Sequence, residues 1–144
     1  MRLGFPVKVL GQAGLKEHDS RRWQNHPHLS VSLAYLRDIF EYLRRERIRM
    51  YRISSDLAPY LTHPELTQFH GQIEECAAEL AAVGDLARAI GLRLSFHPSQ
   101  YVVLNAPDEA LVAKSTLDIV TQVEILDRMG LDDEAVVVLH VGGV

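Results

Sequence analysis

The sequence predicts an α/β fold in which a parallel sheet is covered by helices. Four short apolar runs are separated by helix-like segments, so strands and helices alternate along the chain. The last apolar run, residues 135–139, is continuously apolar and rich in valine, which is typical of strands buried on both faces of a parallel sheet. This alternation occurs in open sheets and in closed barrels. The pattern alone leaves both architectures open.

The predicted strands are residues 2–5, 49–53, 92–96 and 135–139. A first helix, capped by Ser30, is predicted to run to about residue 46. Its inward face is Leu36, Ile39, Phe40 and Leu43.

A second helix is predicted from about residue 68 to residue 90, with Gly91 as its stop signal. Its inward face is Ile73, Ala77, Leu80, Gly84 and Ala87. A third helix opens with Pro107, Asp108 and Glu109, a favourable first turn, and closes at Gly130. Its predicted apolar stripe is Val112, Thr116, Ile119, Val123 and Leu126.

Length and composition predict one domain, residues 1–144, with a single core. The chain has 144 residues, of which 47% are hydrophobic, and this is enough for one globular domain. No apolar run is long enough for a membrane span. The single cysteine, Cys76, excludes an internal disulfide and favours a cytoplasmic location. The formal net charge of −4 counts mildly against a nucleic-acid binder, although the local charge of the binding face matters more.

Several common catalytic motifs are missing from the sequence. Gly11 and Gly14 are not followed by the strand-to-helix pattern of a phosphate-binding loop. There is no Gly-x-Ser-x-Gly elbow. Gly142 and Gly143 could let the backbone approach a ligand, but a tight turn is the simpler interpretation.

Polar residues stand directly after the predicted strands. Ser54, His97 and His140 occupy strand ends at equal spacing, and His63 lies in the loop after the second strand. Active residues of such folds gather where the carboxyl ends of parallel strands meet the loops. Neutral imidazole is a common ligand of zinc and also suits manganese. The pattern therefore allows a metal site, although buried histidines with satisfied hydrogen bonds remain the alternative.

Four stretches together resemble the ultraviolet damage endonuclease (UvdE) family: "RLGFPV", "YRISSDLAPYLTHPEL", "LRLSFHPSQYVV" and "VVVLHVGG". They occur in the family's order and spacing, and the resemblance extends over nearly the whole chain. The resemblance implies a TIM-type (β/α) barrel, of which residues 1–144 would be the N-terminal half with about four β/α units. A C-terminal half or a second chain would then complete the barrel.

The resemblance also implies a function and a site. Family members nick damaged double-stranded DNA on the 5′ side of ultraviolet photoproducts by divalent-metal-activated hydrolysis. His63, His97 and His140 match the family's metal-ligand histidines, with Mn²⁺ as the expected ion and Mg²⁺ or Zn²⁺ as alternatives. No catalytic side chain beyond these ligands is expected, because a bound metal can activate the water.

Gln100 and Tyr101 match the pair that the family inserts into the duplex at the lesion. A tyrosine ring can stack where bases have been extruded, and a glutamine can hydrogen-bond the orphaned base edges. An aromatic residue covering the barrel mouth is the plainer interpretation of Tyr101. Phe5 and Lys8 fall where relatives line the lesion pocket, and the difference from the family pattern there leaves lesion preference open.

Two other functions fit parts of the sequence. A metal-dependent sugar isomerase or epimerase would use the same barrel rim but has no need of a Gln-Tyr wedge. A non-catalytic DNA-damage binding module would keep the wedge without a complete metal cluster.

Overall fold

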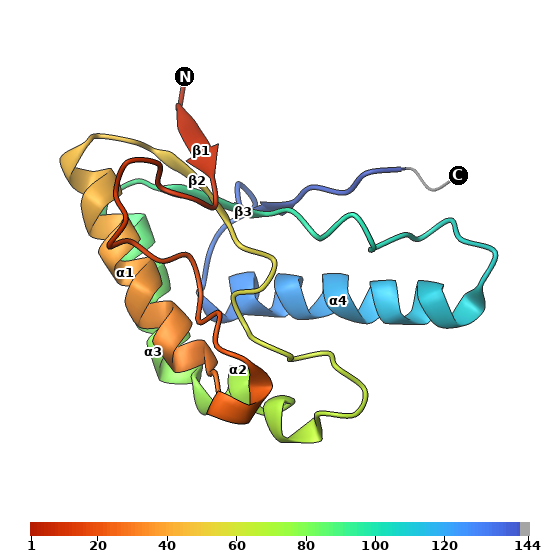
Figure 1. Ribbon diagram of the computed structural model, residues 1–144. Helices are drawn as coiled ribbons and strands as arrows, with labels where there is room; N and C mark the ends of the chain where they lie inside the picture. Colours follow the sequence, from red (N-terminus) through yellow and green to blue (C-terminus); the bar gives the residue numbers. More distant parts are fainter. Residues whose placement is uncertain (142–144) are drawn as a thin grey trace.

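The computed structural model of the chain describes residues 1–141 and contains one four-stranded parallel sheet. The strands follow one another in chain order across the sheet. They are β1 (Gly4–Pro6), β2 (Met50–Ile53), β3 (Arg93–Phe96) and β4 (Val136–Val137). Helices connect successive strands and cover one face of the sheet (Figure 1). The predicted α/β class, as the first four units of a TIM-type barrel, is confirmed.

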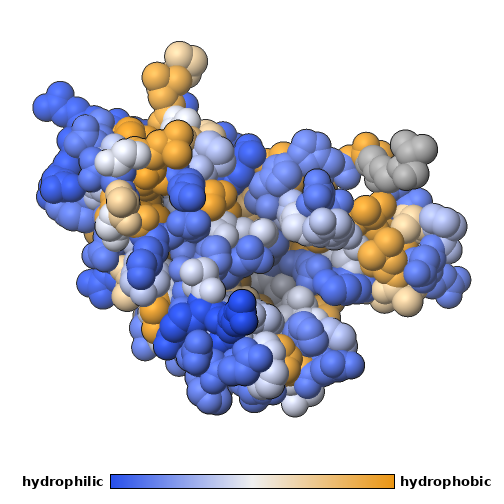
Figure 2. All heavy atoms as spheres, viewed as in Figure 1, coloured by the Kyte–Doolittle hydropathy of each residue, from blue (hydrophilic) through white to orange (hydrophobic). Residues whose placement is uncertain are grey.

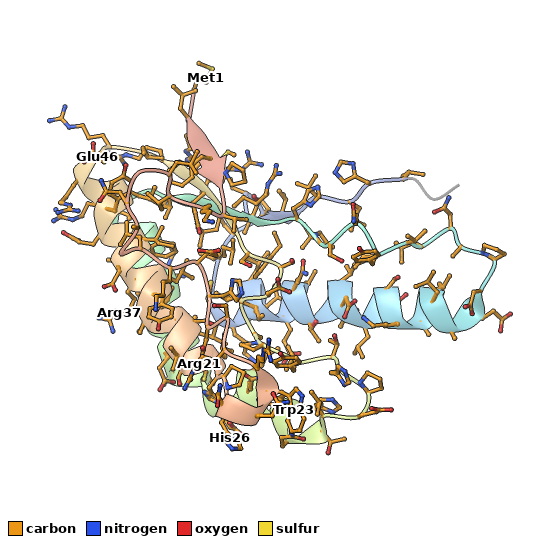
Figure 3. All side chains as sticks on the ribbon, viewed as in Figure 1. Met1, Arg21, Trp23, His26, Arg37 and Glu46 are labelled. Carbon is orange, nitrogen blue, oxygen red and sulfur yellow. The ribbon has the colours of Figure 1, made fainter. Side chains whose placement is uncertain are left out.

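The helical connections contain four α-helices and two short 3₁₀ helices. They are η1 (Trp23–Asn25), α1 (Leu29–Arg45), η2 (Thr67–Phe69), α2 (Gln72–Glu75), α3 (Ala77–Ala89) and α4 (Glu109–Arg128). Arg21, Trp23 and His26 lie at the end of α1 where the helix begins, and Glu46 lies at its other end (Figure 3). None of the helices in residues 1–141 has the length and hydropathy that a membrane crossing requires.

The core lies between the sheet and the helices. Tyr51 and Ile53 of β2, and Leu94 and Phe96 of β3, are buried against the helical layer. Successive side chains of a strand point to opposite faces, so Arg52 belongs to the face that the helices leave uncovered. The predicted inward residues of α1 are all fully buried.

Gly84 lets α3 approach α4 closely. A Cβ atom at this position would lie 1.7 Å from the carbonyl oxygen of Met129, a distance that no side chain allows. The prediction that Gly84 faces inward is therefore confirmed, and glycine at this position is a packing requirement. Gly91 and Gly130 follow α3 and α4 with positive φ angles, as predicted for residues that end helices.

Two predicted helix features were wrong. His28, not Ser30, is the N-cap of α1, and its side chain accepts a hydrogen bond from the Ser30 amide. The predicted second helix is interrupted at Cys76, which separates α2 from α3. The predicted first turn is instead a separate 3₁₀ helix, η2, and the buried Gln72 side chain donates a hydrogen bond to the carbonyl of its last residue, Phe69.

The apolar stripe predicted for α4 was wrong in part, since only Leu126 of its residues is fully buried. Val123 is 41% exposed and Thr116 is exposed as well. The fully buried residues of α4 are Leu126, as predicted, and Ser115, Gln122 and Ile125, which were not predicted. This helix carries apolar residues on two sides, and hydrophobic periodicity does not tell which side meets the core.

The strand limits differ from the prediction at both edges of the sheet. β1 begins and ends later than expected, and β4 contains only two residues. The last ladder bond runs from the Val138 amide to the Phe96 carbonyl. Beyond it β3 leads into Pro98, which has no amide donor, so the pairing stops there. Gly142 and Gly143 lie outside the described residues.

Asp19 connects the loop after β1 to the start of α1. Its buried carboxylate accepts hydrogen bonds from Arg21 Nε at 2.8 Å and from the His28 amide at 2.9 Å. The hydrogen bond from the Arg21 side chain is the main reason why the pKa of Asp19 is lowered, and burial opposes it. The ionised form of Asp19 therefore stabilises the fold.

We expect Asp19→Asn to lower the free energy of unfolding by about 2 kcal/mol at pH 7, because it weakens charge-assisted hydrogen bonds. Since the folded pKa is depressed, the stabilisation is present above the ordinary carboxyl pKa and is lost as pH falls through the folded pKa. Urea denaturation should show that variant and wild type differ less in their free energy of unfolding at pH 3 than at pH 7. Glu41→Gln, which removes an exposed ion pair with Arg44, is the control. An equal difference at both pH values would contradict the role of the charge.

Candidate functional site

His97 and His140 meet at the carboxyl end of the sheet. Each follows a strand, β3 and β4 respectively, and their Nε2 atoms lie 2.5 Å apart. The ring centroids are 4.5 Å apart and the ring planes are inclined by 63°. Two neutral imidazoles can share a hydrogen bond here only if one of them carries its proton on Nε2. The Nε2 atom of a neutral imidazole is also a common metal ligand, and two such atoms stand next to each other here.

His63 lies in the loop after β2 and does not join this pair. Its Nδ1 accepts a hydrogen bond from the Glu65 amide at 3.3 Å, and its carbonyl accepts one from His70 Nε2 at 2.7 Å. The edge of the Tyr60 ring packs near it, with centroids 6.3 Å apart. Within residues 1–141 no three His, Cys, Asp or Glu side chains form a group that could hold a metal.

A groove of about 580 Å³ borders His63. Its walls come from the loops after β1 and β2, from the end of β3 and from α4. In the space-filling view the surface is hollowed between α4 and the loop that runs below it (Figure 2). The polar lining includes His18, Arg21, Thr62, His63, Ser99, Lys114, Asp118 and Gln122. The Oε1 atom of Gln122 is buried there without a hydrogen-bond partner in residues 1–141.

Gln72 holds the two ends of the His63 loop. Its side chain is buried and donates hydrogen bonds to the carbonyls of Pro59 at 2.7 Å and Phe69 at 2.9 Å. Its Oε1 atom accepts a hydrogen bond from the Leu29 amide at the start of α1. One side chain therefore satisfies three backbone groups and fixes the loop against the helical layer.

Gln100 and Tyr101 occupy an exposed turn just after His97. Tyr101 is 73% exposed, and its amide donates to Ser99 Oγ at 3.3 Å. Pro98 before the turn is buried. After the turn, the Val103 amide donates to Ser115 Oγ of α4 at 2.9 Å. The two side chains therefore project from a turn that is anchored on both sides.

Phe5 and Lys8 have different surroundings. Phe5 belongs to β1 and packs edge-on against Tyr51, with centroids 5.7 Å apart, so it adjoins the core between sheet and helices. Lys8 follows β1 and is exposed. Val7 between them has a positive φ angle, and its carbonyl accepts a hydrogen bond from the Tyr51 hydroxyl. The position of Phe5 gives no support to a role in lesion binding.

Sequence reasoning missed the residues that hold the His63 loop. Thr62 stands next to His63 in the stretch "YRISSDLAPYLTHPEL". Its hydrogen-bond partner, Asp118, is 56 positions away. Lys114 and Asp118 are four residues apart on α4, a spacing that predicts an ion pair on one helix face, as observed. That spacing gave no sign of the contact with Thr62.

Comparison with known proteins identifies the family. The profile described as UV-endonuclease UvdE matches residues 14–144. The chain belongs to this family. The UV DNA damage endonuclease of Bacillus velezensis is 33% identical over 142 residues, 96% of this chain and 43% of the relative. The UV-damage endonuclease of Schizosaccharomyces pombe is 35% identical over 100 residues, 67% of this chain and 16% of that protein.

A solved structure of this family also matches. The crystal structure of SacUVDE superimposes with a TM-score of 0.81 and 28% sequence identity, over 95% of this chain and 48% of that chain. The chain therefore spans less than half the length of the UvdE relatives it matches.

We expect Gln72→Leu to lower the free energy of unfolding by about 2–4 kcal/mol, because it leaves buried backbone groups unpaired. Chemical denaturation measures the change. Gln68→Leu, at an exposed position four residues earlier, should change the free energy by less than about 0.5 kcal/mol. Equal effects of the two substitutions would show that the three hydrogen bonds contribute little.

Proposed function

We propose that this chain carries part of the active site of a metal-dependent UV-damage endonuclease, which nicks DNA on the 5′ side of photoproducts. The facing Nε2 atoms of His97 and His140 are the observation on which the proposal rests. They stand at the carboxyl ends of parallel strands, where barrel enzymes gather reactive groups. Family membership supports DNA as the substrate.

His97 and His140 would hold one divalent cation, and His63, which does not join this pair in the structure, would be a ligand at the same end of the sheet. Mn²⁺ is the first candidate and Mg²⁺ or Zn²⁺ are the alternatives, because imidazole nitrogen suits several of these ions. When bound, such an ion polarises the scissile phosphate and activates water. Within this chain, strand β3 would keep the His97 ring oriented, so little ordering is required on binding. No other side chain is assigned a proton-transfer role.

Gln100 and Tyr101 would enter the duplex at the lesion. Their exposure on an anchored turn supports this role. Side chains that enter a duplex must project from the protein, and their backbone must stay in place when they contact stacked bases. Extruding a base costs a few kcal/mol, and less where damage already weakens stacking. Lesions would therefore be selected without reading the DNA sequence. Lys8 is free to approach a phosphate.

A non-catalytic DNA-damage binding module is the second candidate. The small number of converging ligands favours this candidate, because only two of the three histidines meet within residues 1–141. It would retain the wedge and hold at most a weakly bound ion. A sugar isomerase loses support, since the family match points to DNA endonucleases.

The two candidates differ in what they do to irradiated DNA. The endonuclease candidate predicts that the chain, incubated with Mn²⁺ and end-labelled irradiated duplex, produces a nick on the 5′ side of photoproducts. Denaturing gel electrophoresis detects the nick, and unirradiated duplex is the control. Selective retention in a gel-shift assay without nicking would favour the binding module. Indifference to irradiation in both assays would contradict both candidates.

We expect His97→Ala and His140→Ala each to weaken Mn²⁺ binding by about tenfold or more, as losses at metal sites commonly do. The double variant should bind only slightly more weakly than either single variant, because the two rings act on one ion. Titration followed by electron paramagnetic resonance measures free Mn²⁺. His26→Ala, at an exposed loop position, should leave the affinity unchanged. If the losses of Mn²⁺ affinity in the two single variants added up in the double variant, this would contradict a shared ion.

We expect Tyr101→Ala to reduce the preference for irradiated over unirradiated duplex by about tenfold, since stacking on an aromatic ring is worth about 1–3 kcal/mol per base. Mn²⁺ affinity should not change. Competition gel shifts with the two duplexes measure the preference. Leu104→Ala removes another exposed side chain of the same segment and serves as the control. An equal loss of metal affinity would argue against a wedge.

A further inference from the structure

A side-chain hydrogen bond ties the loop that carries His63 to α4. Thr62 Oγ1 donates a hydrogen bond to Asp118 Oδ1 at 2.5 Å. The two residues are 56 positions apart in the chain, so the contact links separate elements. It lies on the wall of the groove that His63 also borders.

Asp118 is itself held in place. Its second oxygen accepts a hydrogen bond from Lys114 Nζ at 2.9 Å. The Asp118 side chain is 18% exposed, whereas that of Lys114 is 54% exposed. The carboxylate therefore lies against the loop, and the Lys114 side chain contacts it from the solvent side. Both oxygens are occupied, which restricts the carboxylate to one orientation toward Thr62.

Among residues 1–141, the His63 ring makes one hydrogen bond and one aromatic contact. Its Nδ1 accepts one long hydrogen bond, from the Glu65 amide, and the ring meets the edge of Tyr60. Neither contact reaches outside the loop. Gln72 fixes the loop at Pro59 and Phe69, which are several residues from His63 on either side. Thr62 is the neighbouring residue, so its bond to Asp118 is the nearest side-chain connection to another helix.

We propose that Asp118 is a positioning residue for His63, acting through Thr62. It restricts the backbone at residue 62 and so sets where the His63 ring stands relative to the sheet end. The inference rests on the proposed function, in which His63 is a metal ligand. It assigns no contact between Asp118 and the ion. A carboxylate that only stabilised α4 would have no effect on the loop.

The experiment uses substitutions that separate the hydrogen bond from the charge. Thr62→Val removes the hydroxyl at nearly constant shape, whereas Thr62→Ser retains it. Asp118→Ala removes the acceptor, whereas Asp118→Asn retains one. Lys114→Met removes the ion pair but leaves the Thr62 bond. Amide hydrogen exchange of the chain without metal is measured at His63 and Leu66, whose amides bond the Tyr60 and His63 carbonyls.

We expect Thr62→Val and Asp118→Ala to speed exchange at these two amides by about tenfold, while amides within α3 stay as in the wild type. The same two variants should weaken Mn²⁺ binding by about tenfold, the lower limit for partners of metal ligands. Thr62→Ser, Asp118→Asn and Lys114→Met should remain within about threefold of the wild type in both measurements, because each keeps the hydroxyl and its acceptor.

The outcomes separate this inference from the proposed function. Unchanged exchange at His63 and Leu66 in Thr62→Val overturns the inference, whether or not the chain binds Mn²⁺. Faster exchange with unchanged Mn²⁺ affinity also overturns it, since the loop would then move without consequence for the site. A wild-type chain that binds no Mn²⁺ overturns the proposed metal site, and the exchange data alone then decide whether Asp118 positions the loop.

Discussion

The parallel pairing of β3 with β4 is the contact on which the candidate site depends. Ser95 lies opposite Val136 and Phe96 opposite Val137, and this register brings the residues after both strands to the same edge of the sheet. His97 and His140 meet for that reason. The pairing is short, and each backbone hydrogen bond contributes only about 0.5–1.5 kcal/mol. The packing of Val137 against the core therefore matters for the site as much as the ladder does.

Strand alternation explains why the site lies on the uncovered side of the sheet. Tyr51, Leu94 and Phe96 face the helices and are buried. Continuing the alternation along β3 places His97 on the same side as Ser95 and away from Phe96. Phe5 has the opposite parity and packs on Tyr51. Strand alternation therefore assigns His97 to the open face of the sheet and Phe5 to the face that packs on the core.

The sequence predicted the parts of the site that depend on periodicity. Apolar runs ending in His97 and His140, at equal spacing, were enough to place both rings at one edge of a parallel sheet. The position of His63, apart from the His97–His140 pair, was not predictable in this way, because a loop has no period and its course depends on contacts such as those of Gln72 and Asp118. The stripe of α4 was wrong for a related reason. Leu117, Val120 and Val123 are exposed, so an apolar pattern alone did not identify the packed face.

The short segment from His97 to Tyr101 connects the candidate metal site with the candidate wedge. Four residues of extended chain span at most about 14 Å, and buried Pro98 together with the Val103–Ser115 hydrogen bond limits their freedom. Along one DNA strand, successive nucleotides rise by about 3.4 Å. A phosphate beside His97 would therefore lie within a few nucleotides of a base stack entered by Tyr101. In the proposed function, the distance between the nick and the lesion is set by this one connection, without any reading of base sequence.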